Sequence, residues 1–354
     1  MGESSDLGRK TASGIFWSFS DLIANQGIQF IMQVILARLL LPEDFGLIGM
    51  ITIFISLSTT FIDSGFSQAL IREQEVKQED FSTVFFFNLA MACGLYILLF
   101  FTAPLISNFF REPKLVDILR ILSLVLIINS FGIIQRVMLV RRIDFKTQTK
   151  ISVVASVLSG IVAISLAYFG FGVWSLVIRT LSMQFLVAFL LSLSNKWKPS
   201  LVFSVHSFKR LFRFGSRLLV SGLLNTVYMN IYYVIIGRFF SAAELGYFTN
   251  GKKLEEVASQ AVSTSLQRVS YPVLSSMQKD ENRLRAGFSK IIRTSTYINF
   301  PIMVFLAAIA GPLIGLIFGE KWLPSIPYFQ ILCFAGMLYP LHAINLNILQ
   351  VKGR

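Results

Sequence analysis

Ionisable side chains interrupt the long apolar stretches of this sequence at a few positions. Asp63 lies in FIDSGFSQ, Arg179 lies in LVIRTLS, and Lys252 lies in NGKKLEEVAS. A charge near the centre of a bilayer costs at least about 2.5 to 3.5 kcal/mol on insertion scales, so such residues usually face a wet cavity or a partner. We therefore interpret these ionisable residues as candidate cavity residues: Asp21, Asp63, Arg179, Lys252, Lys253, Glu255 and Arg268.

The basic members of this set suit a ligand that carries phosphate. Arginine binds phosphate through two hydrogen bonds, and lysine acts as a point charge. Structural roles are the alternative. Lys252 and Lys253 have the i, i+3 and i, i+4 spacing for pairing with Glu255 and Glu256. Asp63 has the type and position to pair with an arginine or a helix end, or to take part in coupling transport to an ion.

Neutral polar residues form a second candidate set. Asp21, Asn25 and Gln29 follow one another at steps of four, which places them in one stripe along a helix. Asn225 and Asn230 lie in a later apolar stretch together with several tyrosines. Amides and aromatic rings suit the hydroxyls and faces of sugars, and hydrogen bonding between helices is the alternative explanation.

The motifs of common enzymes and metal sites are not found in the sequence. There is no GxxxxGK[ST] loop to hold ATP, and the two histidines, His206 and His342, are far apart. Cys93 and Cys333 lie inside apolar runs, which indicates neither a disulfide nor a metal site. The sequence predicts a protein that is not an enzyme and that needs no metal or cofactor.

The elements that must position these residues are membrane helices. Of the 354 residues, 54% are hydrophobic and 14% are charged, whereas a soluble domain carries roughly 25% charged residues. Apolar stretches long enough to cross the bilayer recur along the chain, and unpaired backbone groups in lipid favour helices. The sequence predicts an all-α polytopic membrane protein with spans at about 14–38, 45–70, 81–106, 115–138, 151–169, 172–194, 214–238, 246–271, 288–310 and 325–350. Charged residues interrupt the predicted eighth span, and the alternative for this segment is a helix that lies at the membrane interface.

The basic residues predict an orientation. The formal charge is +13, but lysines and arginines are scattered among short loops, so we do not expect nucleic-acid binding. With the N-terminus in the cytoplasm, the outside loops hold few of them: Arg38, Arg111, Lys114, Arg238 and Lys321. The positive-inside bias therefore predicts that both termini are cytoplasmic. The polar N-terminus and the span that follows it do not have the pattern of a removable signal peptide.

An internal repeat gives the strongest signal of architecture. ARLLLPEDFGLI, from Ala37, matches GRFFSAAELGYF, from Gly237, and FFREPKLVDILRILSL, from Phe109, matches IFGEKWLPSIPYFQILCF, from Ile317. Six predicted spans separate the copies, which predicts parallel repeats. The predicted domains are a six-helix lobe at 1–195, a basic cytoplasmic linker at 196–213 and a second lobe at 214–354.

At these segments, and at FIDSGFSQALIR and RRIDFKT, the sequence resembles the polysaccharide transporter family of the multidrug/oligosaccharidyl-lipid/polysaccharide exporter superfamily. The resemblance implies a MATE-like pair of lobes around a central cavity. It implies a flippase that moves a lipid-linked oligosaccharide to the outer leaflet of the bacterial inner membrane by alternating access, for O-antigen, capsule or exopolysaccharide synthesis. It further implies an undecaprenyl-diphosphate-linked substrate, H⁺ or Na⁺ coupling, and contacts with membrane lipids, polymerase and chain-length proteins.

The sequence departs from the family pattern at its end. The second repeat stops after about four of six expected helices, so we expect a C-terminally truncated chain. The alternative functions are a MATE-type drug or metabolite exporter and a non-transporting membrane subunit of polysaccharide assembly.

Overall fold

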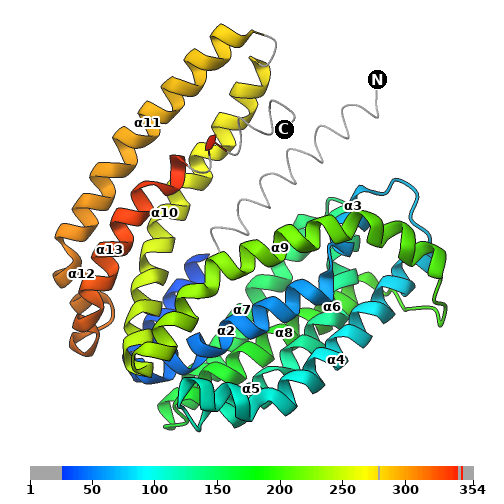
Figure 1. Cartoon of the computed structure of the whole chain (residues 1–354), viewed down its shortest axis with the longest axis horizontal. Helices are drawn as coiled ribbons and strands as arrows, with labels where there is room; N and C mark the ends of the chain where they lie inside the picture. The colour runs from blue at the N-terminus through cyan, green and yellow to red at the C-terminus, as the bar shows by residue number, and fades with distance from the viewer. Residues whose placement is uncertain (1–25, 278–279, 342–343, 346–354) are drawn as a thin grey trace. The chain divides into compact units, whose positions relative to one another are not determined.

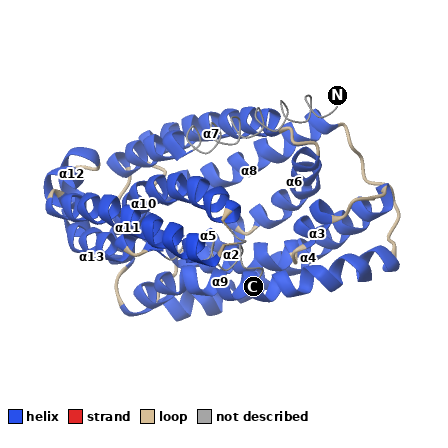
Figure 2. Cartoon of the chain, turned by 90° about the horizontal axis from the view of Figure 1, so that it is seen from above, coloured by secondary structure: helices blue, strands red, loops and turns tan. Residues whose placement is uncertain are grey.

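The structure, a computed structural model, describes residues 26–277, 280–341 and 344–345. Every regular element in these residues is a helix, and no strand occurs among them (Figure 2). The chain divides into two compact units, Met1–Leu245 and Gly246–Arg354. The predicted all-α fold class is therefore confirmed.

The first unit contains helical residues 26–39 and eight further helices (Figure 1). These are α2 (Pro42–Asp63), α3 (Phe66–Arg72), α4 (Gln78–Phe110), α5 (Leu115–Leu122), α6 (Leu124–Arg141), α7 (Phe145–Tyr168), α8 (Val173–Asn195) and α9 (Val205–Phe239). The next helix, α10 (Ala242–Ser276), begins in this unit and continues into the second. The second unit also contains α11 (Glu281–Ala308), α12 (Ala310–Ile317), the 3₁₀ helix η1 (Glu320–Ser325) and α13 (Ile326–Met337).

Seven helical stretches of the described chain are long and apolar enough to cross a membrane. They are 42–72, 78–110, 115–141, 145–168, 173–195, 205–239 and 282–308. They coincide with the predicted second to seventh and ninth spans. The predicted first and tenth spans lie partly outside the described residues, and the eighth falls within α10, which is not among the seven. The count of about ten spans stays a prediction.

Helix packing in the first unit joins α7 to α8, α8 to α6, α6 to α4, and α2 to α9. Phe66 and Leu70 of α3 pack with Phe85 of α4, Ile134 of α6 and Leu211 of α9. Large apolar side chains also remain exposed, as in α4, where Phe101 is 73% and Leu105 is 69% exposed. Such surfaces are expected where helices contact lipid.

The predicted basic linker, 196–213, is only partly a connection. Residues 205–213 form the first turns of α9, and residues 196–204 are tied to the start of α4. The Gln78 amide donates to the Lys198 carbonyl at 2.8 Å, and Trp197 Nε1 donates to Gln78 Oε1 at 2.7 Å. The Ser204 N–H donates to Thr83 Oγ1 at 2.9 Å. The division into lobes at 1–195 and 214–354 stays a prediction.

The first repeat match has the same local structure in both copies. One helix ends at residue 39 and the next begins at Pro42, and likewise one ends at Phe239 and the next begins at Ala242. Each restart is capped locally. Asp44 Oδ2 accepts from the Leu41 N–H at 3.0 Å, and Ser241 Oγ accepts from the Glu244 N–H at 3.2 Å. The sequence match therefore corresponds to a repeated helix–turn–helix junction.

In the second unit, α10, α11 and α13 meet around Gly336. Glu255 of α10 lies so close that a Cβ on Gly336 would be 2.2 Å from Glu255 Oε1. The Asn299 amide of α11 donates to the carbonyls of Gly336 and Met337 at 3.1 and 3.0 Å. Because α13 ends at Met337, these carbonyls lack continuous helical partners, and Asn299 satisfies them inside the protein.

Candidate functional site

A break between α2 and α3 begins the site. Ser64 and Gly65 both have left-handed backbone angles, with φ of 45° and 73°, so the helix stops after Asp63 and restarts at Phe66. The restart leaves N–H groups without helical partners. Asp63 Oδ1 accepts from the Ser67 N–H at 3.2 Å and also from the Ser67 hydroxyl. The Asp63 carboxylate is thereby fixed at the break.

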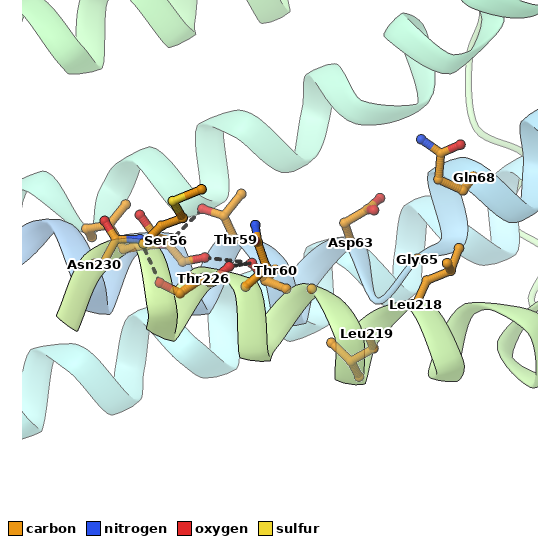
Figure 3. Close-up of a pocket in the computed structure, with 14 residues that line it drawn as sticks. Ser56, Thr59, Thr60, Asp63, Gly65, Gln68, Leu218, Leu219, Thr226 and Asn230 are labelled. Atoms are coloured by element: carbon orange, nitrogen blue, oxygen red, sulfur yellow. Dashed lines mark hydrogen bonds between the residues drawn. The ribbon is translucent and has the colours of Figure 1, made fainter. Parts of the chain in front are cut away.

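A groove of about 630 Å³ lies between α2–α3 and α9 (Figure 3). Its lining residues come from these helices and from the break: Ile55, Ser56, Thr59, Thr60, Asp63, Gly65, Gln68, Leu218, Leu219, Gly222, Asn225, Thr226, Met229 and Asn230. Hydroxyl, amide and carboxylate groups are thus gathered at one place in a chain made of apolar helices.

Helical periodicity explains why these residues share a groove. Ser56, Thr59, Thr60 and Asp63 are spaced at i, i+3, i+4 and i+7, which places them on one face of α2. On α9, steps of three and four connect Gly222 to Asn225, Thr226, Met229 and Asn230. Two polar stripes, one from each helix, therefore face each other.

Hydrogen bonds hold the two stripes together. Thr60 Oγ1 donates to the Ser56 carbonyl at 3.0 Å. Because this uses its only proton, the Thr226 hydroxyl must be the donor in the 3.0 Å contact between Thr60 Oγ1 and Thr226 Oγ1. The Asn230 amide donates to the Thr226 carbonyl at 2.8 Å. The interior of the groove is therefore a connected polar network across α2 and α9, visible as the dashed contacts in Figure 3.

Glycines bring the helices into backbone contact beside the groove. A Cβ on Gly65 would lie 2.6 Å from the Gly215 carbonyl oxygen, and a Cβ on Gly215 would lie 2.5 Å from the Ser64 carbonyl oxygen. Both distances are too short for any side chain, so this approach, the Gly65–Gly215 crossing, requires glycine at both positions. The crossing closes the seam between α3 and α9 on one side of the groove.

The structure brings together three of the residues predicted from sequence: Asp63, Asn225 and Asn230 all line the groove. Gln29 and Arg179 are half-buried and lie outside the lining. No carboxylate in the described part of the chain lies within ion-pair distance of Arg179. The predicted candidates Asp21 and Asn25 lie outside the described residues.

The charged candidates of α10 form local pairs. Lys252 Nζ lies 3.9 Å and Lys253 Nζ lies 3.7 Å from the carboxylate of Glu256, at the i, i+4 and i, i+3 spacings. Glu255 is buried in the second unit, against Gly336. The side chain of Arg268 lies outside the described ones. A role for these residues in lining a cavity stays a prediction.

The sequence interpretation missed the hydroxyls and one amide of the groove. Ser56, Thr59, Thr60, Gln68 and Thr226 line it but carry no charge to mark them. For Ser56, Thr59 and Thr60 the signal was the spacing of polar residues in ISLSTTFID. That signal is weak, since a threonine in an apolar helix can satisfy itself on the carbonyl four residues earlier, as Thr59 does on Ile55 at 2.8 Å.

Residues 35–327 match the family described as polysaccharide biosynthesis protein. Among curated proteins, the teichuronic acid biosynthesis protein TuaB of Bacillus subtilis is 28% identical, with 98% of this chain and 72% of the relative covered. The succinoglycan biosynthesis transport protein ExoT of Rhizobium meliloti is 27% identical, with 92% of this chain covered. The chain spans 66% of the length of ExoT.

Among solved structures, the lipid II flippase MurJ in an inward closed conformation has a similar fold. The TM-score is 0.78 at 15% sequence identity, covering 96% of this chain and 76% of that one. At this level of identity the likeness concerns the fold. The likeness to this helical fold and the seven apolar helices described above support a multi-pass membrane protein.

Proposed function

The chain belongs to the polysaccharide biosynthesis protein family, and from that premise we propose that it is a flippase for a lipid-linked oligosaccharide. One observation carries the proposal: a groove of hydroxyl, amide and carboxylate groups lies between two apolar helices, α2 and α9. A sugar chain crossing a bilayer must exchange its hydrogen bonds with water for bonds to protein. The groove supplies such partners between helices that are long and apolar enough to cross a membrane.

The location of the groove also suits alternating access. Helices α2 and α9 both lie in the first compact unit, but the predicted lobe division assigns α2 to the first lobe and most of α9 to the second. On that division the groove lies between the predicted lobes. A site on such a seam is exposed to one side or the other when repeated halves rock against each other. Transport is then a conformational process, and the protein needs no catalytic residues.

The lining favours sugars over the drug-like ligands of the alternative, an exporter. None of the lining residues in the described part of the chain is aromatic, and Asp63 is the single carboxylate among them. Flat cationic drugs are usually held by aromatic faces and acidic groups. Hydroxyls and amides instead match the many donors and acceptors of an oligosaccharide.

The cellular setting is part of the proposal. We place the protein in the bacterial inner membrane with a cytoplasmic N-terminus, acting on an undecaprenyl-diphosphate-linked oligosaccharide. Asp63 is a candidate for H⁺ or Na⁺ coupling because its carboxylate lines the groove. Polymerase and chain-length proteins would receive the product on the outer side.

Reconstitution of the full-length protein into liposomes tests the function. A lipid-linked oligosaccharide in the inner leaflet becomes accessible to an added lectin once it is flipped. We expect wild type to transfer it, and the double variant Thr60→Val, Thr226→Val to do so roughly fivefold to tenfold more slowly because two polar partners are lost.

Thr102→Val is the matched control, since the Thr102 hydroxyl bonds to the Leu98 carbonyl of its own helix and lies outside the groove. This control should transfer the lipid like wild type. Transport of a cationic dye but of no lipid-linked oligosaccharide would replace the flippase with the exporter.

A further inference from the structure

A second opening lies on the same seam, beyond the Gly65–Gly215 crossing. It has a volume of about 440 Å³, and it lies between the end of α3 and the start of α9. Along α9 its lining ends at Phe214, the crossing follows at Gly215, and the groove begins at Leu218. We call this opening the vestibule; its lining residues are Ala69, Arg72, Glu73, Gln74, Arg210, Leu211 and Phe214.

Arg72 is an exposed cation of the vestibule. Its guanidinium lies over the ring of Phe214, with 4.5 Å from Cζ to the ring centroid. No carboxylate of the described residues lies within ion-pair distance of it. Stacking on a ring holds the guanidinium plane while leaving its N–H edge available, which is the edge that binds phosphate oxygens in pairs.

Arg210 differs from Arg72 because it is already paired. Its Nη2 lies 2.7 Å from Asp80, whose side chain is 1% exposed, and its Nη1 lies 3.9 Å from Glu73. These contacts fix the wall of the vestibule and pair Arg210 with two carboxylates. Recognition of an anion would therefore depend chiefly on Arg72.

The segment that carries Arg72 is held in place from the side. Arg141 of α6 donates to the carbonyls of Leu70, Glu73 and Gln74, the last two at 2.5 and 3.2 Å. Leu70 lies in the last turn of α3, and Glu73 and Gln74 follow it, where carbonyls lack helical partners. Because Arg141 supplies the partners, the position of Arg72 is set before any ligand arrives, which lowers the entropy lost on binding.

From this geometry we propose that the vestibule binds the phosphate oxygens of a lipid diphosphate at the membrane surface, through Arg72, before the attached sugar enters the groove. The inference rests on the proposed function and names the chemical group recognised at its entrance. The Gln74 amide offers a further donor beside Arg72. An anionic phospholipid presents the same phosphate chemistry, and the experiment must separate the two sources.

Binding of a short isoprenyl diphosphate to the full-length protein tests this directly. The protein is placed in nanodiscs of phosphatidylcholine, and Kd is measured for wild type and three variants. We expect Arg72→Gln to weaken binding at least about tenfold, since a charge-assisted pair is lost. The Kd of Arg72→Lys should lie between those of wild type and Arg72→Gln, because lysine keeps the charge but lacks the planar N–H edge.

Arg111→Gln is the matched control. Arg111 is also exposed and loses the same charge, but it follows the other end of α4, at the end of the helix remote from Asp80. It should bind the probe like wild type. Equal affinities for wild type and Arg72→Gln, with both proteins folded by their melting temperature, would overturn the proposal.

Nanodiscs that contain phosphatidylglycerol distinguish the two sources. Undiminished probe binding there supports a diphosphate site, whereas loss of binding at equal lipid concentration assigns the vestibule to phospholipid and overturns the diphosphate. This assay measures no transport. A protein that binds the probe through Arg72 but flips nothing separates failure of the function from failure of the site.

Discussion

At the scale of single residues, Asp63 occupies a position that suits two different roles. Its carboxylate caps the restarted helix α3 by accepting from the Ser67 N–H and hydroxyl. The same side chain lines the groove, as does Gln68 beyond the helix break (Figure 3). A cap needs only an acceptor oxygen, whereas coupling to a cation or proton needs the ionisable group. The two roles can therefore be separated by substitution.

Replacing Asp63 by asparagine should keep the fold and impair transport. The amide oxygen still accepts from the Ser67 N–H, so the melting temperature should remain close to that of wild type. Because the ionisable group in the groove is gone, we expect the flipping rate to fall roughly tenfold. Asp63→Ala should in addition lose about 1 kcal/mol of stability with the cap.

Asp117→Asn serves as the control for charge, since Asp117 is an exposed carboxylate of α5 outside the groove. Both variants are measured in the liposome assay at equal protein content. If Asp63→Asn flips the lipid as fast as wild type, the carboxylate is a helix cap and nothing more.

Sequence reasoning located part of the site because charges and amides are conspicuous among apolar residues. Asp63, Asn225 and Asn230 could be selected this way, and they do line one groove. The hydroxyls of Thr60 and Thr226 could not, since their use depends on a contact between segments far apart in the chain. Arg179 shows the opposite case, a conspicuous charge in a span that takes no part in the groove.

At the scale of elements, the spans were predictable and their interruptions were not. Hydropathy predicts one span at 45–70 and another at 115–138, since it responds only to apolar length. The structure breaks the first at Ser64 and Gly65 and the second at Ser123. The first break depends on left-handed backbone angles, which leave no trace in hydropathy. The groove owes its position to that break.

The Gly65–Gly215 crossing gives the element-scale prediction. In Gly215→Ala the new Cβ would lie 2.5 Å from the Ser64 carbonyl oxygen, so α3 and α9 must move apart. Such overpacking typically costs about 1 to 3 kcal/mol. We expect the apparent Tm in detergent to fall by several degrees.

A second glycine supplies the comparison. A Cβ on Gly94 in α4 meets nothing within 4 Å, and alanine is the better helix former by roughly 0.5 to 1 kcal/mol. Gly94→Ala should therefore leave Tm unchanged or raise it slightly. Equal Tm values for the two variants would mean that the crossing is not a tight contact in the protein.

At the scale of the whole molecule, basic residues cluster near alternate ends of the helices of the first unit. Arg72 ends α3, Lys77 precedes α4 and Arg141 ends α6, and these helix ends lie on one side of the unit. Lys196 and Lys198 follow the end of α8 on the same side. Only Arg111 and Lys114 lie between α4 and α5. Positively charged loops remain in the cytoplasm, so the segment between α3 and α4 should be cytoplasmic. The vestibule would then face the side on which lipid-linked sugars are made.

Labelling of single cysteines tests this orientation. Cys93 and Cys333 are first replaced by alanine, and Glu75→Cys or Lys114→Cys is added on either side of α4. Helix α4 has 33 residues, so at about 1.5 Å per residue it is long enough to cross roughly 30 Å of hydrocarbon. We expect a membrane-impermeant maleimide to label Lys114→Cys in intact spheroplasts, and Glu75→Cys only after permeabilisation.

Each other pattern of labelling has a definite meaning. Label on Glu75→Cys alone in intact spheroplasts would invert the topology and place the vestibule outside, where it could not receive a substrate made in the cytoplasm. Label on both positions would show that α4 does not cross the membrane. The cysteine-free parent must remain unlabelled and must still flip the lipid in liposomes, because only then does the orientation belong to the working protein. With the expected pattern, a substrate arriving from the cytoplasm would meet the vestibule first, then the Gly65–Gly215 crossing and then the groove, in their order along α9.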